Sequence, residues 1–331
     1  KGGVHGRKIN VVLRDDGYSP ARAMANLTEM KGNVFAVAAL LGTAIVNTTK
    51  DFFAENKIPL ITAYGDVRIW EKYPKDKLRW AFVSYPDYAD EAEFLTGYAV
   101  KNLGAKKISV FYQNDDYGKM GLEGVKLALS KLPGASLGVT IPYDVTERAL
   151  ATHAQKLKEG GADLLLLYTS PSHGPLILKE MAKFDYRPKV IATFTLGDPI
   201  MYKLAGADVW EGVYPAVPAN SSIPGEPAAD KVIEILKKYE PKIVGKEYLA
   251  LFGAVSMMHT VEGLKNAGRN LTPEGMIKGM EMIKNWKPEG LGAPVTYAPD
   301  RRHGVNGSRL THAENGKHVP LSDYVIYKPL F

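Results

Sequence analysis

The chain has 331 residues, of which 45% are hydrophobic and 24% charged, values typical of a soluble globular protein with two domains of ordinary size. It contains no cysteine, which excludes disulfides, thiolate metal sites and a cysteine nucleophile. The net charge of +6 comes from 42 basic and 36 acidic residues that are scattered along the chain, so nucleic-acid binding has little support. No apolar run is long enough to span a membrane, and we expect no direct membrane insertion.

The first part of the chain alternates strand-like and helix-like segments. Apolar and β-branched runs predict strands at residues 8–15, 34–41, 58–63 and 79–85. Helix-period segments predict helices at 21–30 and 44–55. Ser19 and Pro20 precede the first of these helices as a cap and an N1 proline. The short joints between these segments favour a parallel sheet with right-handed crossovers.

A second set of alternating segments follows. Strands are predicted at 107–112, 136–143, 164–169 and 189–194. Helices are predicted at 89–103, 120–132, 149–159 and 175–184. Two such sets in one chain predict an α/β protein with two similar, doubly wound lobes. Residues 214–227 are rich in proline, alanine and serine, and they predict a connection that leaves one lobe.

The last third of the chain is mainly helical. It predicts helices at 228–239, 247–268 and 273–283, and short β pieces at 310–313 and 322–327. Apolar residues recur mostly three apart on the long middle helix, so one of its faces is expected to be buried. The run Met257-Met258-His259 on this helix is interpreted as core packing rather than a ligand or metal site. A helical stretch without its own strands must pack on an earlier sheet, so we expect the chain to return to the first lobe.

A candidate binding site lies where the apolar run of residues 34–41 passes through Gly42 into a helix. Open α/β sheets bind ligands at the carboxyl ends of their strands. Free amides at the helix start, together with the Thr43 hydroxyl, form a candidate binding site for a carboxylate or another acceptor-rich group. The alternative interpretation is an ordinary strand-to-helix turn in which Thr43 is only the N-cap. The two roles are compatible, since Thr43 could cap the helix and also bind.

Several kinds of chemistry have no support in the sequence. The seven histidines lie far apart, without the spacing of a metal site. Gly118, Gly121 and Gly124 lack the Gly-x-Gly of a dinucleotide fingerprint, which disfavours a nucleotide site. The pairs Asp15-Asp16 and Asp115-Asp116 follow strands, where neighbouring side chains point to opposite faces, so they are interpreted as turn and capping residues.

Neutral polar and aromatic residues recur at the predicted strand ends. They are Thr43, Tyr64, Tyr88, Tyr117, Tyr168, Ser170, Phe194 and Thr195. Hydroxyls and rings without a nucleophile and base favour binding without turnover. We therefore expect no catalytic residues, no metal and no cofactor.

With these residues assembled, the chain resembles the periplasmic solute-binding proteins of branched-chain amino-acid-type ABC transporters. These are leucine/isoleucine/valine-binding-like type I proteins with a Venus-flytrap fold. The resemblance extends in order over essentially the whole chain, and its specificity comes from that order. It is carried by KGGVHGRK at 1–8, DDGYSP at 15–20 with Ala23, YQNDDYG at 112–118, Ala205-Gly206 before Glu211-Gly212, and GAPVTY at 292–297.

The resemblance implies two Rossmann-like lobes joined by three crossovers, near residues 84–87, 214–219 and 307–311. One lobe is then formed by 1–84 with 220–306, and the other by 85–219 with 307–331. The family's first strand and first helix have no counterpart here, so the sequence is expected to be part of the mature chain. The implied location is periplasmic, or extracellular with a lipid anchor, with a signal segment that this sequence does not contain.

The resemblance also implies that the ligand is held between the lobes. In the first lobe the implied ligand-binding residues are Gly42, Thr43, Ala44, Ala63, Tyr64, Gly65 and Asp66. In the second lobe they are Tyr88, Tyr117, Ser170, Phe194 and Thr195. The implied partners are a small-molecule ligand and an ABC transporter permease, and the protein is expected to be a monomer.

The expected ligand is a small aromatic or aliphatic carboxylate, with a branched-chain amino acid as second choice. Amino-acid binders of the family usually carry an acidic residue at the position of Phe194, and a phenyl ring cannot pair with an ammonium. An unpaired ammonium in a closed cleft would cost several kcal/mol, unless Asp66 or another carboxylate replaces the missing acid. The amino-acid sequences of the motifs also resemble those of the subgroup that binds aromatic carboxylates. Two alternatives stay open, namely a ligand-sensing regulator or receptor domain on the same scaffold, and a Rossmann-type enzyme.

Overall fold

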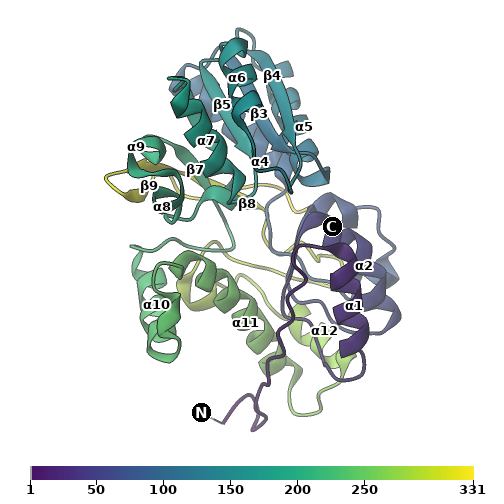
Figure 1. Cartoon of the computed structure of the whole chain (residues 1–331). Helices are drawn as coiled ribbons and strands as arrows, with labels where there is room; N and C mark the ends of the chain where they lie inside the picture. Colours follow the sequence, from purple (N-terminus) through teal and green to yellow (C-terminus); the bar gives the residue numbers. More distant parts are fainter. Residues whose placement is uncertain (1) are drawn as a thin grey trace.

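The computed structural model describes residues 2–331, so Lys1 lies outside the described part of the chain. Figure 1 shows two α/β lobes, one above the other. We call the lower body, which contains α1, α2 and α10 to α12, the first lobe, and the upper body around the large sheet the second lobe. The two-lobed α/β architecture predicted from the sequence is therefore present.

The second lobe is built on an eight-stranded sheet of order β10-β8-β7-β6-β5-β3-β4, with β9 paired to β8. Its strands are β3 Lys107–Gln113, β4 Ser136–Tyr143, β5 Leu164–Tyr168, β6 Lys189–Ala192, β7 Tyr214–Pro218, β8 Gly307–Glu314, β9 Lys317–Pro320 and β10 Val325–Ile326. Strands β4, β3, β5, β6 and β7 are parallel, and β8 is antiparallel to β7, β9 and β10. The four parallel strands predicted for this lobe are confirmed.

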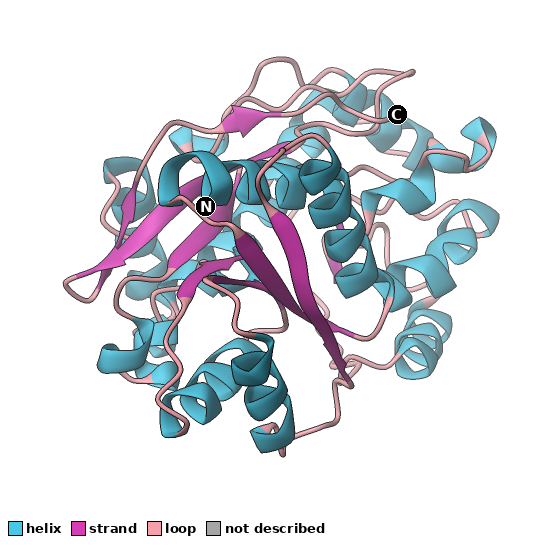
Figure 2. Cartoon of the chain, turned by 90° about the horizontal axis from the view of Figure 1, so that it is seen from above, coloured by secondary structure: helices cyan, strands magenta, loops and turns pink. Residues whose placement is uncertain are grey.

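Helices cover both faces of this sheet, as the view from above shows (Figure 2). They are α4 Tyr88–Leu103, α5 Asp116–Ser130, α6 Ala151–Gly160, α7 His173–Lys183, α8 Met201–Ala205 and α9 Ala207–Trp210. Side chains of β5 alternate between the faces, because Leu164 and Leu166 pack with α4 and α5 whereas Leu165 and Leu167 pack with α6 and α7. A strand buried on both faces explains the unbroken apolar run in the sequence.

Two glycines of α5 serve close packing rather than nucleotide binding. A Cβ atom on Gly124 would lie 2.4 Å from the carbonyl oxygen of Ala89 on α4. One on Gly121 would lie 2.4 Å from the ring of Tyr168. Asp115 caps the same helix, since its Oδ1 accepts a hydrogen bond from the Gly118 amide at 3.2 Å. These contacts account for Gly121 and Gly124 of the glycine triplet and for Asp115 of the pair Asp115-Asp116.

The first lobe has short strands and longer helices. Its elements are α1 Pro20–Met30, β1 Leu40–Leu41, α2 Thr43–Glu55, β2 Ala63–Tyr64, α3 Lys75–Leu78, α10 Pro227–Tyr239, α11 Glu247–Ala267 and α12 Pro273–Glu281. Strands β1 and β2 pair in parallel, and parallel bridges join Val37 to Leu60 and Leu60 to Ala81. The segments predicted as strands at 34–41, 58–63 and 79–85 thus lie side by side, although their ladders are shorter than predicted.

Two segment predictions were wrong. Residues 8–15 form no strand, because no neighbouring segment among residues 2–331 pairs with their backbone. Their apolar side chains remain exposed, and Leu13 is 83% accessible. Residues 214–227 are not simply a connection, since their first five residues form β7 in the large sheet.

The long helix α11 returns to the first lobe, as predicted. Its Ser256 lies 2.7 Å, hydroxyl to hydroxyl, from Tyr64 of β2. His259 is buried against Trp286 and Tyr297, which confirms that this part of the helix belongs to the core. Burial lowers the pKa of His259 to about 4, so the imidazole is neutral near pH 7.

None of the helices in residues 2–331 combines the length and hydropathy needed to cross a bilayer.

Candidate functional site

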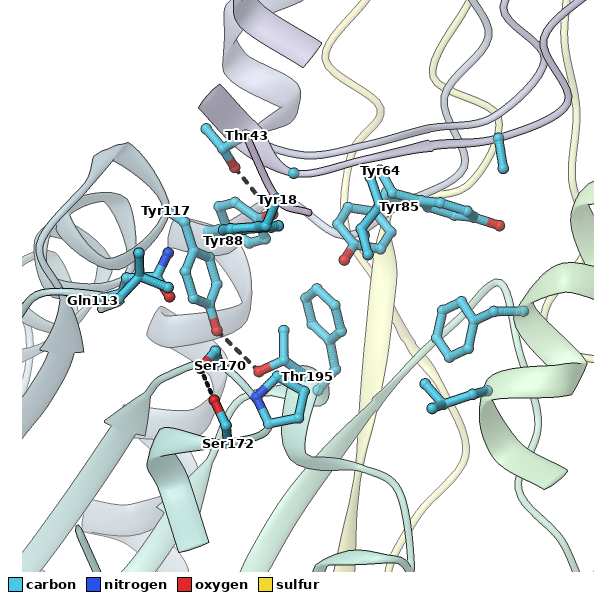
Figure 3. Close-up of a pocket in the computed structure, with 18 of the residues that line it drawn as sticks. Tyr18, Thr43, Tyr64, Tyr85, Tyr88, Gln113, Tyr117, Ser170, Ser172 and Thr195 are labelled. Carbon is cyan, nitrogen blue, oxygen red and sulfur yellow. Dashed lines mark hydrogen bonds between the residues drawn. The ribbon is translucent and has the colours of Figure 1, made fainter. Parts of the chain in front are cut away.

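A cavity of about 570 Å³ lies where elements of the two lobes meet. The first lobe contributes the start of α2, the end of β2 and one face of α11, and the second lobe contributes the start of α4 and the ends of β3, β5 and β6. Figure 3 shows the side chains that face one another across it. Strand ends and helix starts therefore converge on one space, as expected of open α/β sheets.

Most of the residues predicted to bind a ligand lie around this cavity. Those that line it are Gly42, Thr43, Tyr64, Tyr88, Tyr117, Ser170, Phe194 and Thr195. The other four do not line it. Ala44 is exposed on α2, whereas Ala63, Gly65 and Asp66 are buried behind the wall. The structure thus brings together the residues that were placed on the two lobes separately.

Thr43 is the first residue of α2 rather than its N-cap, so the capping interpretation was wrong. Gly42 occupies the cap position with a φ of 117°, which favours glycine. The Thr43 hydroxyl accepts a hydrogen bond from the Asp66 amide at 3.0 Å and lies 3.4 Å from the Tyr88 hydroxyl. Among the described residues, the backbone amides of Thr43 and Ala44 have no hydrogen-bond acceptor. The helix start therefore keeps free donors at the cavity wall.

Asp66 stands behind Thr43 and does not face the cavity. Its side chain is 5% exposed and accepts a hydrogen bond from the Arg68 amide at 2.9 Å. Burial raises the pKa of this carboxyl to about 6. Asp66 therefore orders the loop after β2, and it does not supply the carboxylate that an ammonium in the cavity would need.

Aromatic rings form the middle of the cavity. The ring centroids of Tyr85 and Phe194 lie 4.9 Å apart, those of Tyr88 and Tyr117 4.8 Å, and those of Tyr64 and Tyr85 5.2 Å. Burial raises the pKa values of Tyr85, Tyr88 and Tyr117 well above that of a free tyrosine, so their hydroxyls are neutral. The rings of these pairs are edge-to-face or tilted, and together they present an uncharged surface that suits an apolar ligand body.

Glu91 of α4 lies beneath the aromatic cluster and is completely buried. The Tyr168 hydroxyl is 2.7 Å from the Tyr88 carbonyl oxygen and 2.6 Å from Oε2 of Glu91. A hydroxyl has one proton, so both contacts become hydrogen bonds when Glu91 is protonated and donates to Tyr168. Burial raises the pKa of Glu91 to about 7, in agreement with this arrangement. Glu91 is thus a buried structural support that is protonated below about pH 7.

Several residues that line the cavity were not predicted from the sequence. They are Tyr18, Ala39, Leu41, Tyr85, Gln113, Val145, Arg148, Pro171, Ser172, Tyr248, Leu249, Phe252, Gly253 and Ser256. Of those on α11, Leu249 and Phe252 belong to the apolar stripe that was expected to be buried, whereas Tyr248, Gly253 and Ser256 lie outside that stripe. Tyr18 has a φ of 59°, and its backbone amide donates a hydrogen bond to Oδ1 of Asp16 at 2.7 Å. The pair Asp15-Asp16 therefore shapes a turn, as predicted. The Asp-Asp-Gly-Tyr sequence was the available signal for this turn.

A serine and a histidine meet at the wall of the cavity in the second lobe. Ser170 Oγ lies 2.7 Å from Nδ1 of His173. Nε2 of the same ring lies 2.8 Å from the Glu147 carbonyl oxygen, so Nε2 carries the proton and donates, and Nδ1 of the neutral ring accepts from Ser170. Nη1 of Arg148 lies 2.9 Å from Nε2 as a close neighbour. Burial, with the neighbouring guanidinium as a further contribution, lowers the pKa of His173. These neighbours disfavour the imidazolium that would form if His173 accepted the proton of a serine nucleophile.

Within residues 2–331, no three acidic or histidine side chains are placed to hold a metal ion.

The comparisons with known proteins agree with this architecture. The family model described as "Periplasmic binding protein" matches residues 1–317. The chain belongs to the periplasmic binding protein family. The resemblance found in the sequence is thereby confirmed at the level of the family.

Individual relatives of this periplasmic binding protein are distant. A "Leu/Ile/Val-binding protein homolog 3" of Brucella melitensis biotype 1 is 22% identical over 248 residues, which are 71% of this chain and 62% of that protein. A branched-chain amino acid ABC transporter structure from Thermus thermophilus with bound valine has a TM-score of 0.84 at 19% identity, over 99% of this chain and 88% of that one. A fatty acid ABC transporter substrate-binding protein from Thermomonospora curvata has a TM-score of 0.81 at 22% identity, over 99% and 84% of the two chains. At these identities the structural likeness establishes the fold.

Proposed function

We propose that this protein is an extracytoplasmic solute-binding protein that delivers a small carboxylate ligand to an ABC importer. The observation that carries the proposal is the 570 Å³ cavity between two lobes, whose lining contains aromatic rings and hydroxyls but no carboxylate. Family membership and the printed functions of the relatives point in the same direction. The lobes are proposed to divide as 1–84 with 220–306 and 85–219 with 307–331.

The ligand is an aromatic or aliphatic acid in first place and a branched-chain amino acid in second. Phe194 stands where an amino-acid binder of the family would carry an acid, and Asp66 does not reach the cavity. An amino acid would therefore bury its ammonium without a counter-charge. The relatives named for valine and for fatty acids represent these two ligand classes.

One acceptor or anionic group of the ligand binds at the start of α2. The free amides of the first turn and the positive end of the helix dipole favour an anion at Gly42 and Thr43. The apolar body lies between Tyr64, Tyr117 and Phe194, which come from different lobes. Closure of the lobes then buries the ligand and presents both lobes to the permease. No catalytic step is part of this function, and the protein acts as a monomer in the periplasm or on a lipid anchor.

The first experiment is mass spectrometry of small molecules released from the purified protein, followed by calorimetric titration with the compound found. An organic acid or a branched-chain amino acid bound at micromolar or better affinity supports the proposal. Loss of its uptake on deletion of the gene then distinguishes transport from a ligand-sensing regulator on the same scaffold. A nicotinamide cofactor that raises the melting temperature would instead favour a Rossmann-type enzyme.

A further inference from the structure

Arg148 is the one charged side chain among the residues that line the cavity. It lies in the segment between β4 and α6, on the wall of the second lobe, and it is exposed. No salt bridge to it is present within residues 2–331. A cationic group at the wall of an otherwise neutral, aromatic cavity is a recognition element for an anion.

The guanidinium is fixed on one side and free on the other. Its Nη1 donates to the carbonyl oxygens of Val145 and Glu147, both at 2.8 Å, and contacts Nε2 of His173 at 2.9 Å. In the described chain, Nε and Nη2 of Arg148 have no acceptor. An arginine held by one nitrogen leaves the other two available as the planar fork that binds a carboxylate.

The two groups of hydrogen-bond donors, namely the free amides at the start of α2 and the guanidinium of Arg148, belong to opposite lobes. Figure 3 shows Thr43 on one side of Tyr117, and Ser170 and Ser172 on the other side. Ser170 and Ser172 contact Nδ1 of His173 at 2.7 and 3.1 Å, so their hydroxyls belong to the same network as Arg148. The cavity thus has the free amides of α2 at one end, an aromatic middle, and Arg148 with two hydroxyls at the other end.

We propose that the ligand carries a second anionic group, which binds Arg148. This inference rests on the proposed function and specifies its substrate class as a dicarboxylate with an apolar aromatic or aliphatic middle. A monocarboxylate bound at α2 would leave the guanidinium without a counter-charge when the lobes close, and desolvation of an unpaired charge is unfavourable. A dianion places one anionic group at the amides of α2 and the other at Arg148. It then contacts both lobes at once, which is what ligand-driven closure requires.

The test compares acids that share a skeleton and differ by one carboxylate. Terephthalate is compared with benzoate, and adipate with hexanoate, by calorimetric titration at one ionic strength, with L-leucine as a fifth probe. We expect the wild type to bind at least one dicarboxylate tenfold or more tightly than its monocarboxylate. Arg148→Gln should reduce this ratio to about two or less, and Arg148→Lys should retain part of it because the charge remains. Lys156→Gln removes the same charge from exposed α6, away from the cavity, and should keep the wild-type ratio.

Unchanged melting temperatures verify that the variants are folded. The inference is overturned if the wild type prefers the monocarboxylate in both pairs, if only L-leucine binds, or if Arg148→Gln preserves the dicarboxylate preference. In these cases the proposed solute-binding function still stands. Absence of binding by all four acids and by L-leucine would overturn the proposed function as well, so the two failures are distinguishable.

Discussion

The side chain of Asn306 accepts a hydrogen bond from the backbone amide of Asp87 at 2.8 Å, between segments 219 positions apart in the chain. The amide nitrogen of Asn306 also donates to Oδ2 of Asp90 at 3.0 Å and to the Lys328 carbonyl at 2.9 Å. Asn306 is completely buried. One residue therefore joins three passages of the chain at the junction of the lobes.

Replacement of Asn306 by alanine should destabilise this junction. The buried Asp87 amide would lose its acceptor, and an unsatisfied buried donor costs about 1–3 kcal/mol. We expect a decrease of this size in the free energy of unfolding measured with urea. The matched control is Asn102→Ala on the exposed face of α4, which should change stability by less than about 0.5 kcal/mol. Equal effects of the two substitutions would contradict the role assigned to Asn306.

Glu91 should make stability depend on pH. Its folded-state pKa of about 7 lies above the ordinary glutamate value of 4.5, so the folded state holds a proton that the unfolded chain releases earlier. The stability it contributes is complete below about pH 4.5 and is lost as the pH rises through 7. At 1.36 kcal/mol per pKa unit, the loss is on the order of 3 kcal/mol.

The measurement compares urea unfolding of the wild type and of Glu91→Gln at several pH values between 4.5 and 8. The glutamine is neutral throughout, so the wild type should lose stability relative to the variant as the pH rises. Any pH-independent cost of the amide cancels in this comparison. A stability difference that is constant over the whole range would show that Glu91 does not titrate there.

Gly124 should tolerate no side chain. A Cβ atom there would meet the Ala89 carbonyl at 2.4 Å, and overpacking of this kind typically costs about 1–3 kcal/mol. Gly97 on the partner helix α4 has no atom within 4 Å of such a Cβ, so Gly97→Ala should be neutral or stabilise the helix by up to about 1 kcal/mol. Thermal unfolding of both variants tests the contrast, and a stable Gly124→Ala protein would be inconsistent with the close approach of α4 and α5.

Thr43 should affect ligand affinity through its hydroxyl. Thr43→Val keeps the shape but removes the acceptor for the Asp66 amide, which positions the loop behind the cavity wall. We expect ligand affinity to fall by about 1 kcal/mol or more, roughly fivefold, while Thr43→Ser retains most of it. Calorimetry with the native ligand measures both. An unchanged affinity of the valine variant would remove Thr43 from the site.

Periodicity in the sequence predicted most of the fold because local pattern and tertiary burial agree in the second lobe. The run Leu164 to Leu167 is apolar without interruption since helices cover both faces of β5. The prediction failed at residues 8–15, where the alternation suits a strand but no described neighbour pairs with it. A strand is defined by its partner, and periodicity does not report the partner.

The cavity was predicted in part, for the same reason. Residues at strand ends could be located, because parallel strands end at one edge of the sheet. Arg148 lies in a polar loop whose sequence resembles any exposed turn, and only the fold brings it to the cavity. Leu249 and Phe252 have the spacing of a packing stripe, and nothing in that spacing separates a core face from a cavity wall.

The aromatic cavity has a spectroscopic consequence. Six tyrosines and two phenylalanines line it, and none of the four tryptophans does. Trp70 and Trp210 are buried in the cores of the first and second lobe, respectively. Tryptophan emission will therefore respond weakly to a ligand, whereas tyrosine absorbance will respond directly. Replacement of Phe252 by tryptophan would place a single reporter at the wall of the cavity.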